Sequence, residues 1–86
     1  MPTEIPVGKI SHYFNKIGVA VVEVSAEIKI GDKIAIVSKD GKRFEQAVDS
    51  MQIENTKIAV AKPGQSIGMK VTQPVREGMQ VFKIVG

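Results

Sequence analysis

The stretch Ile28-Lys29-Ile30-Gly31-Asp32-Lys33-Ile34-Ala35-Ile36-Val37 decides the fold of this chain of 86 residues. Apolar and polar residues alternate over its first three positions, as is typical of a strand with one face in water. A Gly-Asp pair follows, and both residues favour a turn, because glycine adopts positive φ without strain and aspartate bonds its own backbone. The nearly unbroken apolar run that ends at Val37 indicates a strand covered on both faces. The stretch therefore predicts a corner of an all-β fold.

Composition narrows the class of protein. Hydrophobic residues make up 43% of the sequence, which is ordinary for a globular domain, so we expect one domain over residues 1–86 with a short tail at 1–6. The chain has no cysteine, which removes disulfides and thiolate chemistry and fits a reducing compartment. With no long apolar run and no leader-like N-terminus, we expect a cytoplasmic protein without a membrane segment. The net charge of +3 permits a polyanionic partner without requiring one.

Short strand-like segments, about seven in all, are separated by turn signals at regular spacing. Asp40-Gly41 lies between two of them and predicts a hairpin. In the segment that follows, the apolar positions change parity near Asp49-Ser50, which predicts a bulge. Because open sheet edges are costly in so short a chain, closure into a small barrel is expected. The strand-like segments span residues 7–14, 19–24, 28–37, 43–53, 57–61, 66–71 and 79–85.

Signals for catalysis are poor. His12 is the single histidine, and the carboxylates lie mostly at turns or at polar strand positions, where solvation explains them. Residues 64–70 contain two glycines and a lysine but not the spacing of a phosphate-binding loop. Asn15-Lys16-Ile17-Gly18 lacks the aspartate that a guanine-binding signature needs. We therefore expect no catalytic residue, no metal site and no cofactor.

Basic and aromatic residues offer a weak binding signal. Three cations surround the predicted hairpin tip, and an aromatic residue precedes a loop that carries an asparagine and a lysine. An aromatic ring beside lysines on a barrel rim can stack on a base while the lysines pair with phosphates. In the alternative interpretation, Phe14 belongs to the core and the lysines only solvate turns and protect edges. The candidate RNA-binding residues are Tyr13, Asn15, Lys16, Lys39, Lys42, Arg43 and Lys62.

Three pieces in register, of which the first runs from Gly8 through Ile34, resemble one family. Gly8-Lys9-Ile10, Ile28–Ile34, Ala61–Gly68 and Arg76–Val81 resemble the second domain of translational GTPases such as elongation factors Tu and 1A. The resemblance runs from about Val7 to Val85. The overall likeness is to stand-alone translation elongation factor-like proteins. It implies a closed, six- to seven-stranded antiparallel Greek-key barrel of the translation-protein type.

The same resemblance implies a function. In elongation factor Tu, the loop between the first two strands of this barrel helps to hold the aminoacyl end of tRNA. The residues of this chain that match that loop include Phe14, Asn15, Lys16 and Gly18. Val19 stands where that factor has an arginine, and no GTPase domain is present, so GTP is not expected as a ligand.

The sequence thus predicts a non-catalytic module that binds tRNA, ribosomal RNA or a ribonucleoprotein. The alternative is a protein–protein adaptor or a homodimeric barrel, with a translation-related protein as one expected partner. Such an adaptor would pair through an exposed strand edge near Val81–Val85, as in β-augmentation.

Overall fold

The described structure, a computed structural model that covers residues 3–54 and 56–85, consists of strands joined by turns and irregular segments, with no helix in that part of the chain. The corner at Gly31-Asp32 is present, as the sequence predicts. The strands are β1 (Thr3–Phe14), β2 (Val19–Val24), β3 (Ile28–Lys29), β4 (Lys33–Val37), β5 (Arg43–Ala47), β6 (Met51–Ile53), β7 (Thr56–Ile58), β8 (Val60–Ala61), β9 (Ser66–Lys70) and β10 (Gln80–Val85).

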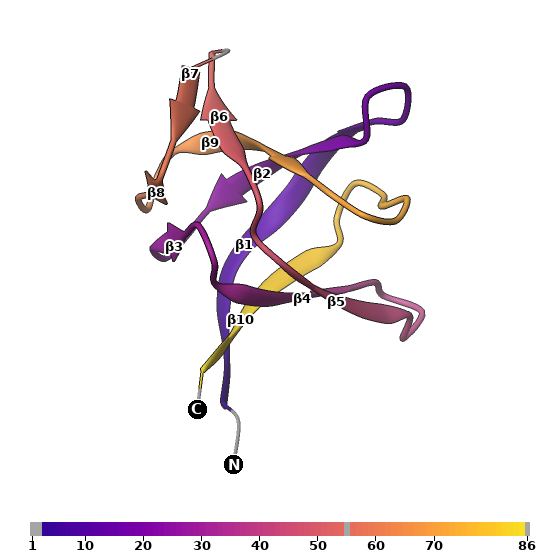
Figure 1. Cartoon of the computed structure of the whole chain (residues 1–86). Helices are drawn as coiled ribbons and strands as arrows, with labels where there is room; N and C mark the ends of the chain where they lie inside the picture. The colour runs from indigo at the N-terminus through magenta and orange to yellow at the C-terminus, as the bar shows by residue number, and fades with distance from the viewer. Residues whose placement is uncertain (1–2, 55, 86) are drawn as a thin grey trace.

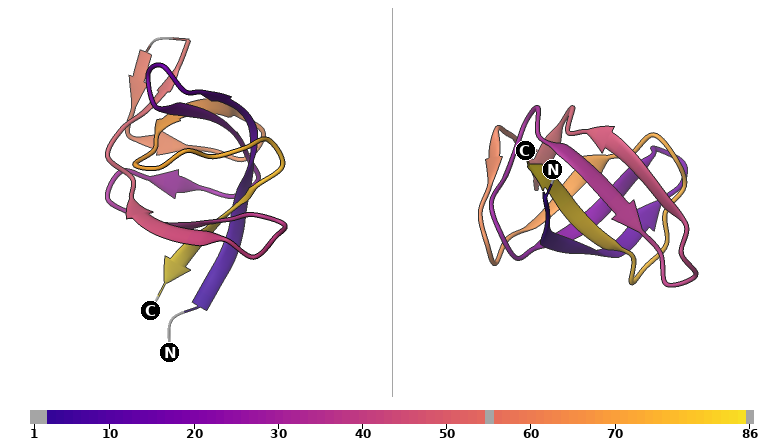
Figure 2. Two further views of the ribbon diagram at one scale, coloured as in Figure 1. Left: turned by 90° about the vertical axis from the view of Figure 1, so that its right-hand side faces the viewer. Right: turned by 90° about the horizontal axis from the view of Figure 1, so that it is seen from below.

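Eight of these strands form one antiparallel sheet in the order β5-β4-β10-β1-β2-β9-β6-β7, and β3 pairs separately with β8. The sheet curls around the core (Figures 1 and 2). The long strand β1 joins its two halves, because its first part pairs with β10 and its second part pairs with β2. The prediction of an all-β antiparallel fold is confirmed.

The Gly31-Asp32 corner redirects the chain between the two sheets. Ile28 pairs with Ala61 in the small sheet, whereas β4 pairs with β5 and β10 in the large one. The carboxylate of Asp32 accepts a hydrogen bond of 2.8 Å from the N–H of Lys29. Two backbone hydrogen bonds of 2.9 Å join the corner to Val48. The N–H of Gly31 donates to the C=O of Val48, and the N–H of Val48 donates to the C=O of Asp32. The corner is therefore held by its own carboxylate and by the segment after β5.

The core lies inside the curled sheet. The three central residues of β4 are all buried, which confirms that this strand is covered on both faces. Each fully buried aliphatic side chain contributes about 1.5–3 kcal/mol relative to its exposed state. The largest fully buried side chains include Ile10, Ile28, Ile34, Ile36, Met51, Ile67 and Met69.

The expected closed barrel of six to seven strands is wrong. The large sheet is longer than that, and within residues 3–54 and 56–85 no ladder joins its end strands β5 and β7. The reason lies in the segment 43–53, which was expected as one return strand with a bulge. The chain leaves the strand conformation at 48–50 and resumes it as β6. Strand β5 pairs with β4, whereas β6 pairs with β7 and β9. The two strands formed from this segment therefore lie toward opposite ends of the sheet.

Two expectations about the chain ends are also wrong. The predicted tail at 1–6 is partly strand, since Thr3–Pro6 pair with Phe82–Val85; Met1 and Pro2 lie outside the described residues. The edge predicted near Val81–Val85 is not free, because β10 lies between β1 and β4 and pairs with both. The strand-edge adaptor therefore loses the surface on which it was based.

The exposure of the two neighbouring aromatic residues contradicts the alternative interpretation that placed Phe14 in the core. Tyr13 is half-buried and packs against the core, whereas Phe14 is 45% exposed. Pairing between β1 and β2 shifts by one residue between Ile10 and His12. A shift of one residue exchanges the inner and outer faces of a strand, so sequence alternation alone misassigns this pair.

Candidate functional site

Two open hollows lie on the surface of the described structure. The first, of about 680 Å³, crosses strands β10, β1, β2 and the start of β9, and we name it the amide groove. The second, of about 520 Å³, lies between the β4–β5 hairpin and the connection from β9 to β10, and we name it the cationic groove. The sequence predicted no hollow at either place.

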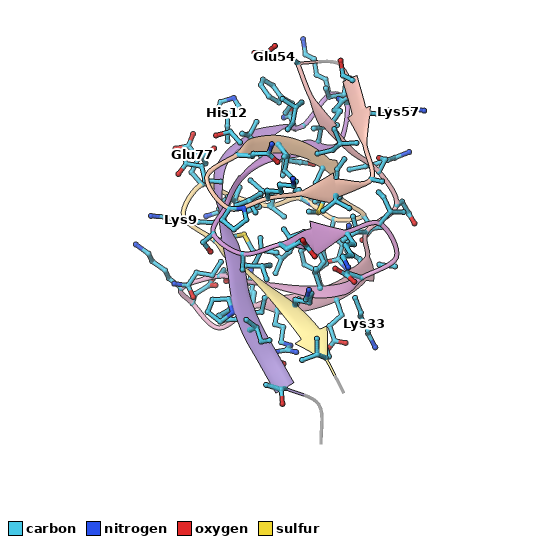
Figure 3. The ribbon with its side chains drawn as sticks, turned by 90° about the vertical axis from the view of Figure 1, so that its left-hand side faces the viewer. Lys9, His12, Lys33, Glu54, Lys57 and Glu77 are labelled. Carbon is cyan, nitrogen blue, oxygen red and sulfur yellow. The ribbon has the colours of Figure 1, made fainter. Side chains whose placement is uncertain are left out.

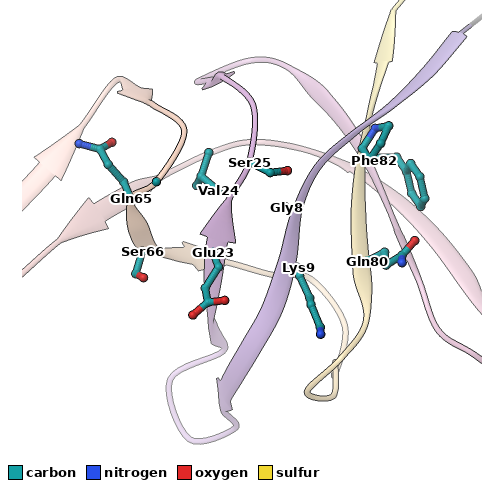
Figure 4. Close-up of a pocket in the computed structure, with 11 residues that line it drawn as sticks. Gly8, Lys9, Glu23, Val24, Ser25, Gln65, Ser66, Gln80 and Phe82 are labelled. Carbon is teal, nitrogen blue, oxygen red and sulfur yellow. The ribbon is translucent and has the colours of Figure 1, made fainter.

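Polar side chains from four adjacent strands line the amide groove (Figure 4). Lys9 is paired in register with Gln80 on one side and with Glu23 on the other, and Glu23 is paired with Ser66. Cross-strand partners of this kind lie about 4.5–5.5 Å apart at Cβ. The row therefore presents an amide, an ammonium, a carboxylate and a hydroxyl in line across the sheet. Its charges cancel, so the groove selects for hydrogen bonding more than for charge.

Hydrophobic and cationic side chains line the cationic groove. Phe44 is half-buried against the core and Met79 is buried, so the floor is apolar. Four cations and two carboxylates surround it: Lys39, Lys42, Arg43 and Arg76, with Asp40 and Glu77. The groove is therefore both apolar at its base and positively charged at its rim.

Arg43 is already engaged by carboxylates. Its guanidinium donates to both carboxylate oxygens of Glu4, one at 2.8 Å, and to Glu45 at 3.1 Å. These hydrogen bonds, that of Glu4 first, raise the pKa of Arg43 above its usual range. The hydrogen bond from Arg43 is also the main cause that lowers the pKa of Glu4 and of Glu45. Arg43 thus fixes β5 to the start of β1 and has little capacity left for a ligand.

The two carboxylates of the cationic groove are engaged as well. Asp40 accepts a hydrogen bond from the hydroxyl of Ser38, and this bond is the main cause that lowers the pKa of Asp40. Glu77 lies 3.3 Å from Nδ1 of His12, and Figure 3 shows the two side chains next to each other. Among residues 3–54 and 56–85, Lys39, Lys42 and Arg76 have no carboxylate within 4.0 Å. The cations with unused charge therefore outnumber the carboxylates.

The structure brings only some of the predicted binding residues together. Lys39, Lys42 and Arg43 line the cationic groove, as their clustering in sequence suggested. The other four lie outside its lining: Tyr13 in β1, Asn15 and Lys16 in the exposed β1–β2 turn, and Lys62 in the turn before β9. The aromatic residue of the groove is Phe44, for which the sequence predicts only a place in a strand.

The connection at 71–79 supplies the residues that sequence reasoning missed, Arg76 among them. Its sequence, with Pro74 and Gly78 between strands, predicts turns and contributes Arg76–Val81 to the family resemblance, but it suggests no binding residue. Its signal was its length, since a long connection between strands often carries function.

The described residues contain neither a cluster of side chains for a metal ion nor a helix for crossing a bilayer. Within 3–54 and 56–85, no group of three or more His, Asp or Glu side chains is placed to hold a metal ion. In the same part of the chain, no helix has the length and apolarity needed to cross a bilayer.

Comparison with known proteins identifies the family. Residues 5–80 match the family described as Peptidase family U32 C-terminal domain. This chain belongs to that family. An uncharacterized protease of Methanocaldococcus jannaschii is 37% identical over 79 residues, which are 92% of this chain and 19% of the relative. A collagenase of Porphyromonas gingivalis is 33% identical over 81 residues, 93% of this chain and 20% of the relative. The chain therefore spans about a fifth of the length of the curated relatives that it matches.

Solved structures support the fold. The C-terminal domain of a Geobacillus thermoleovorans protein assigned to the U32 peptidases aligns with a TM-score of 0.86 over 92% of this chain and 91% of that one, at 21% identity. Its selenomethionine variant gives a TM-score of 0.83 over 88% and 95%, at 20% identity. At that identity, the alignment carries the fold alone.

The family assignment corrects the functional expectation from sequence. The chain is a U32 C-terminal domain and not a translation elongation factor-like protein, so the resemblance to the second domain of translational GTPases is wrong. The predicted role as a module for tRNA or ribosomal RNA is wrong with it.

Proposed function

We propose that this chain is a non-catalytic, polypeptide-binding domain of a U32-type peptidase. The observation that carries the proposal is the length relation: about 80 residues match relatives that are roughly five times longer and are named protease or collagenase. Most of such a protein lies outside the matching segment, which leaves room there for a separate catalytic part.

The residues of the chain favour a binding role over catalysis. The sequence holds one histidine and no cysteine, and His12 is exposed and held by Glu77. The grooves, in contrast, offer hydrogen-bonding and charged groups along an accessible face of the sheet. Peptidases that act on long polypeptides gain from a second contact, because tethered sites raise the effective concentration of the substrate. The predicted cytoplasmic location stays a prediction.

Gelatin and unfolded casein test this proposal on the chain itself. We expect the purified chain to bind immobilised gelatin or reduced, unfolded casein and to leave both uncleaved, with or without added divalent cations. Cleavage by the chain that remains after further purification, and that scales with its concentration, would overturn the non-catalytic assignment. Absence of binding to either polypeptide at low ionic strength would overturn the binding role.

A further inference from the structure

The apolar floor and the charged rim of the cationic groove occur together. Phe44 and Met79 form a hydrophobic base, and the hairpin turn at 38–42 and the connection at 73–79 rise on its two sides. In Figure 1, the β4–β5 hairpin and the connection between β9 and β10 both extend to the right of the view. A groove with an apolar base and a polar rim is the usual form of a peptide-binding site.

The charge that a ligand would meet in this groove is positive. Arg43 is neutralised by Glu4 and Glu45, so it adds little. Asp40, hydrogen-bonded to the neutral hydroxyl of Ser38, and Glu77, beside His12, keep their formal negative charges, so three cations face two carboxylates. Lys39, Lys42 and Arg76 remain, and in the part of the chain that the structure describes none of them has an ion-pair partner.

We propose that the cationic groove binds an acidic segment of a polypeptide that carries an apolar side chain. The carboxylates of such a segment pair with Lys39, Lys42 and Arg76, and the apolar side chain packs on Phe44 and Met79. This inference rests on the proposed function and specifies it, because it names the surface and the chemical class of the polypeptide. Electrostatic complementarity of this kind sets specificity and the rate of association.

The structure offers a charge-matched pair of variants. In Lys39→Glu/Lys42→Glu the groove is reversed in charge, while the hydrogen bond from the backbone N–H of Lys42 to Oγ of Ser38 does not involve the lysine side chain. In Lys57→Glu/Lys62→Glu the net charge changes equally, but both positions lie outside the groove lining. Figure 3 places Lys57 on the opposite side of the view from Glu77, which does line the groove. Equal melting temperatures of the two variants establish that both fold.

Fluorescence anisotropy with two labelled peptides of equal length tests the inference, one alternating Glu with Leu and the other alternating Lys with Leu. At an ionic strength of about 0.01–0.1 M, where surface charges are little screened, we expect the acidic peptide to bind at least about tenfold more tightly. The groove variant should lose about tenfold in affinity for it, the control variant less than about twofold, and Arg76→Ala should weaken binding in the same direction as the groove variant.

Three results would overturn the inference: equal binding of the two peptides, equal losses in both double variants, or tighter binding of a single-stranded RNA oligomer than of the acidic peptide. Acid-processed gelatin, an unfolded polypeptide without net negative charge at neutral pH, separates this inference from the function on which it rests. If the chain binds this gelatin but shows no preference for the acidic peptide, the groove assignment fails while the polypeptide-binding role stands.

Discussion

The side-chain amide of Gln46 donates a hydrogen bond of 2.9 Å to the carbonyl oxygen of Lys70. The same amide accepts one of 2.9 Å from the N–H of Thr72 and one of 3.1 Å from its hydroxyl. Gln46 is the buried polar residue of the described structure, and it lies on the end strand β5, whereas Lys70 ends β9. One side chain thus joins parts of the curled sheet that no ladder connects.

Loss of the Gln46 amide should destabilise the domain. In Gln46→Leu, the Thr72 N–H and the Lys70 C=O lose their partner, and an unpaired buried polar group costs about 1–3 kcal/mol. The free energy of unfolding, measured by urea denaturation, should fall by that amount. The control is Gln80→Leu, at an exposed position of β10, with an expected change within about 0.5 kcal/mol. Equal stabilities of Gln46→Leu and wild type would show that the side chain does not join the sheet.

Addition of a methyl group at Gly8 should destabilise the domain. A Cβ at this position would lie 2.7 Å from Cγ1 of Val22 and 2.8 Å from the backbone oxygen of Glu23, and the latter cannot move without disturbing the β1–β2 ladder. We expect Gly8→Ala to lower the free energy of unfolding by about 1–3 kcal/mol, as overpacking does. Lys9→Ala, at the exposed position next in the strand, is the control. An unchanged midpoint for Gly8→Ala would contradict the close approach of the two strands.

Replacement of Tyr13 should destabilise the domain more than replacement of Phe14. Tyr13 packs against the core, so Tyr13→Ala should cost about 1–2 kcal/mol of stability. Phe14 is 45% exposed, so Phe14→Ala should change stability by no more than about 0.5 kcal/mol. Thermal unfolding of the two variants measures both effects. The reverse order would restore the sequence-based assignment of Phe14 to the core.

The Arg43 network should make stability depend on acid pH. The hydrogen bonds from Arg43 lower the pKa of Glu4 and Glu45 in the folded state below 4.5. A carboxyl group whose pKa is lower in the folded than in the unfolded state stabilises the folded state at pH values above its unfolded pKa. This contribution is lost as the pH falls through the pKa of the folded state. Wild type should therefore melt above Glu4→Gln/Glu45→Gln at neutral pH, by a small and salt-sensitive margin, since these groups are exposed. The margin should shrink as pH falls below about 4.5. A margin that does not change with pH would rule out this linkage.

Local turn chemistry explains why much of the fold was predictable from the sequence. The Gly31-Asp32 corner, the Asp40-Gly41 hairpin and the strand at Val19–Val24 all depend on residues that are neighbours in sequence. Closure, in contrast, depends on which partner each strand finds at long range. Whether Val48–Ser50 would be a bulge or a complete break could not be read from parity alone.

The same turn chemistry explains the misleading family resemblance. Two of its motifs are centred on Gly31 and Gly64, which have φ of 91° and 89°. Positive φ favours glycine in any β protein. The motifs Ile-Gly-Asp and Lys-Pro-Gly therefore indicate a corner and a turn, and they are weak evidence for a common family. The candidate site was half predictable for a related reason. Lys39, Lys42 and Arg43 are neighbours in sequence, whereas Arg76 and Met79 join them only through the tertiary structure.

Grafting of this chain into a longer relative tests the central claim most directly. In one variant of the Porphyromonas gingivalis collagenase the matching segment of 81 residues would be deleted, and in a second it would be replaced by this chain. For both variants, kcat/KM would be measured on a long gelatin fragment and on a short reporter peptide. A non-catalytic polypeptide-binding domain predicts that deletion lowers kcat/KM for gelatin by about tenfold or more, leaves the reporter within about twofold, and is rescued by the graft. Equal loss on both substrates would place the domain in the catalytic machinery, and no loss on either would remove its binding role.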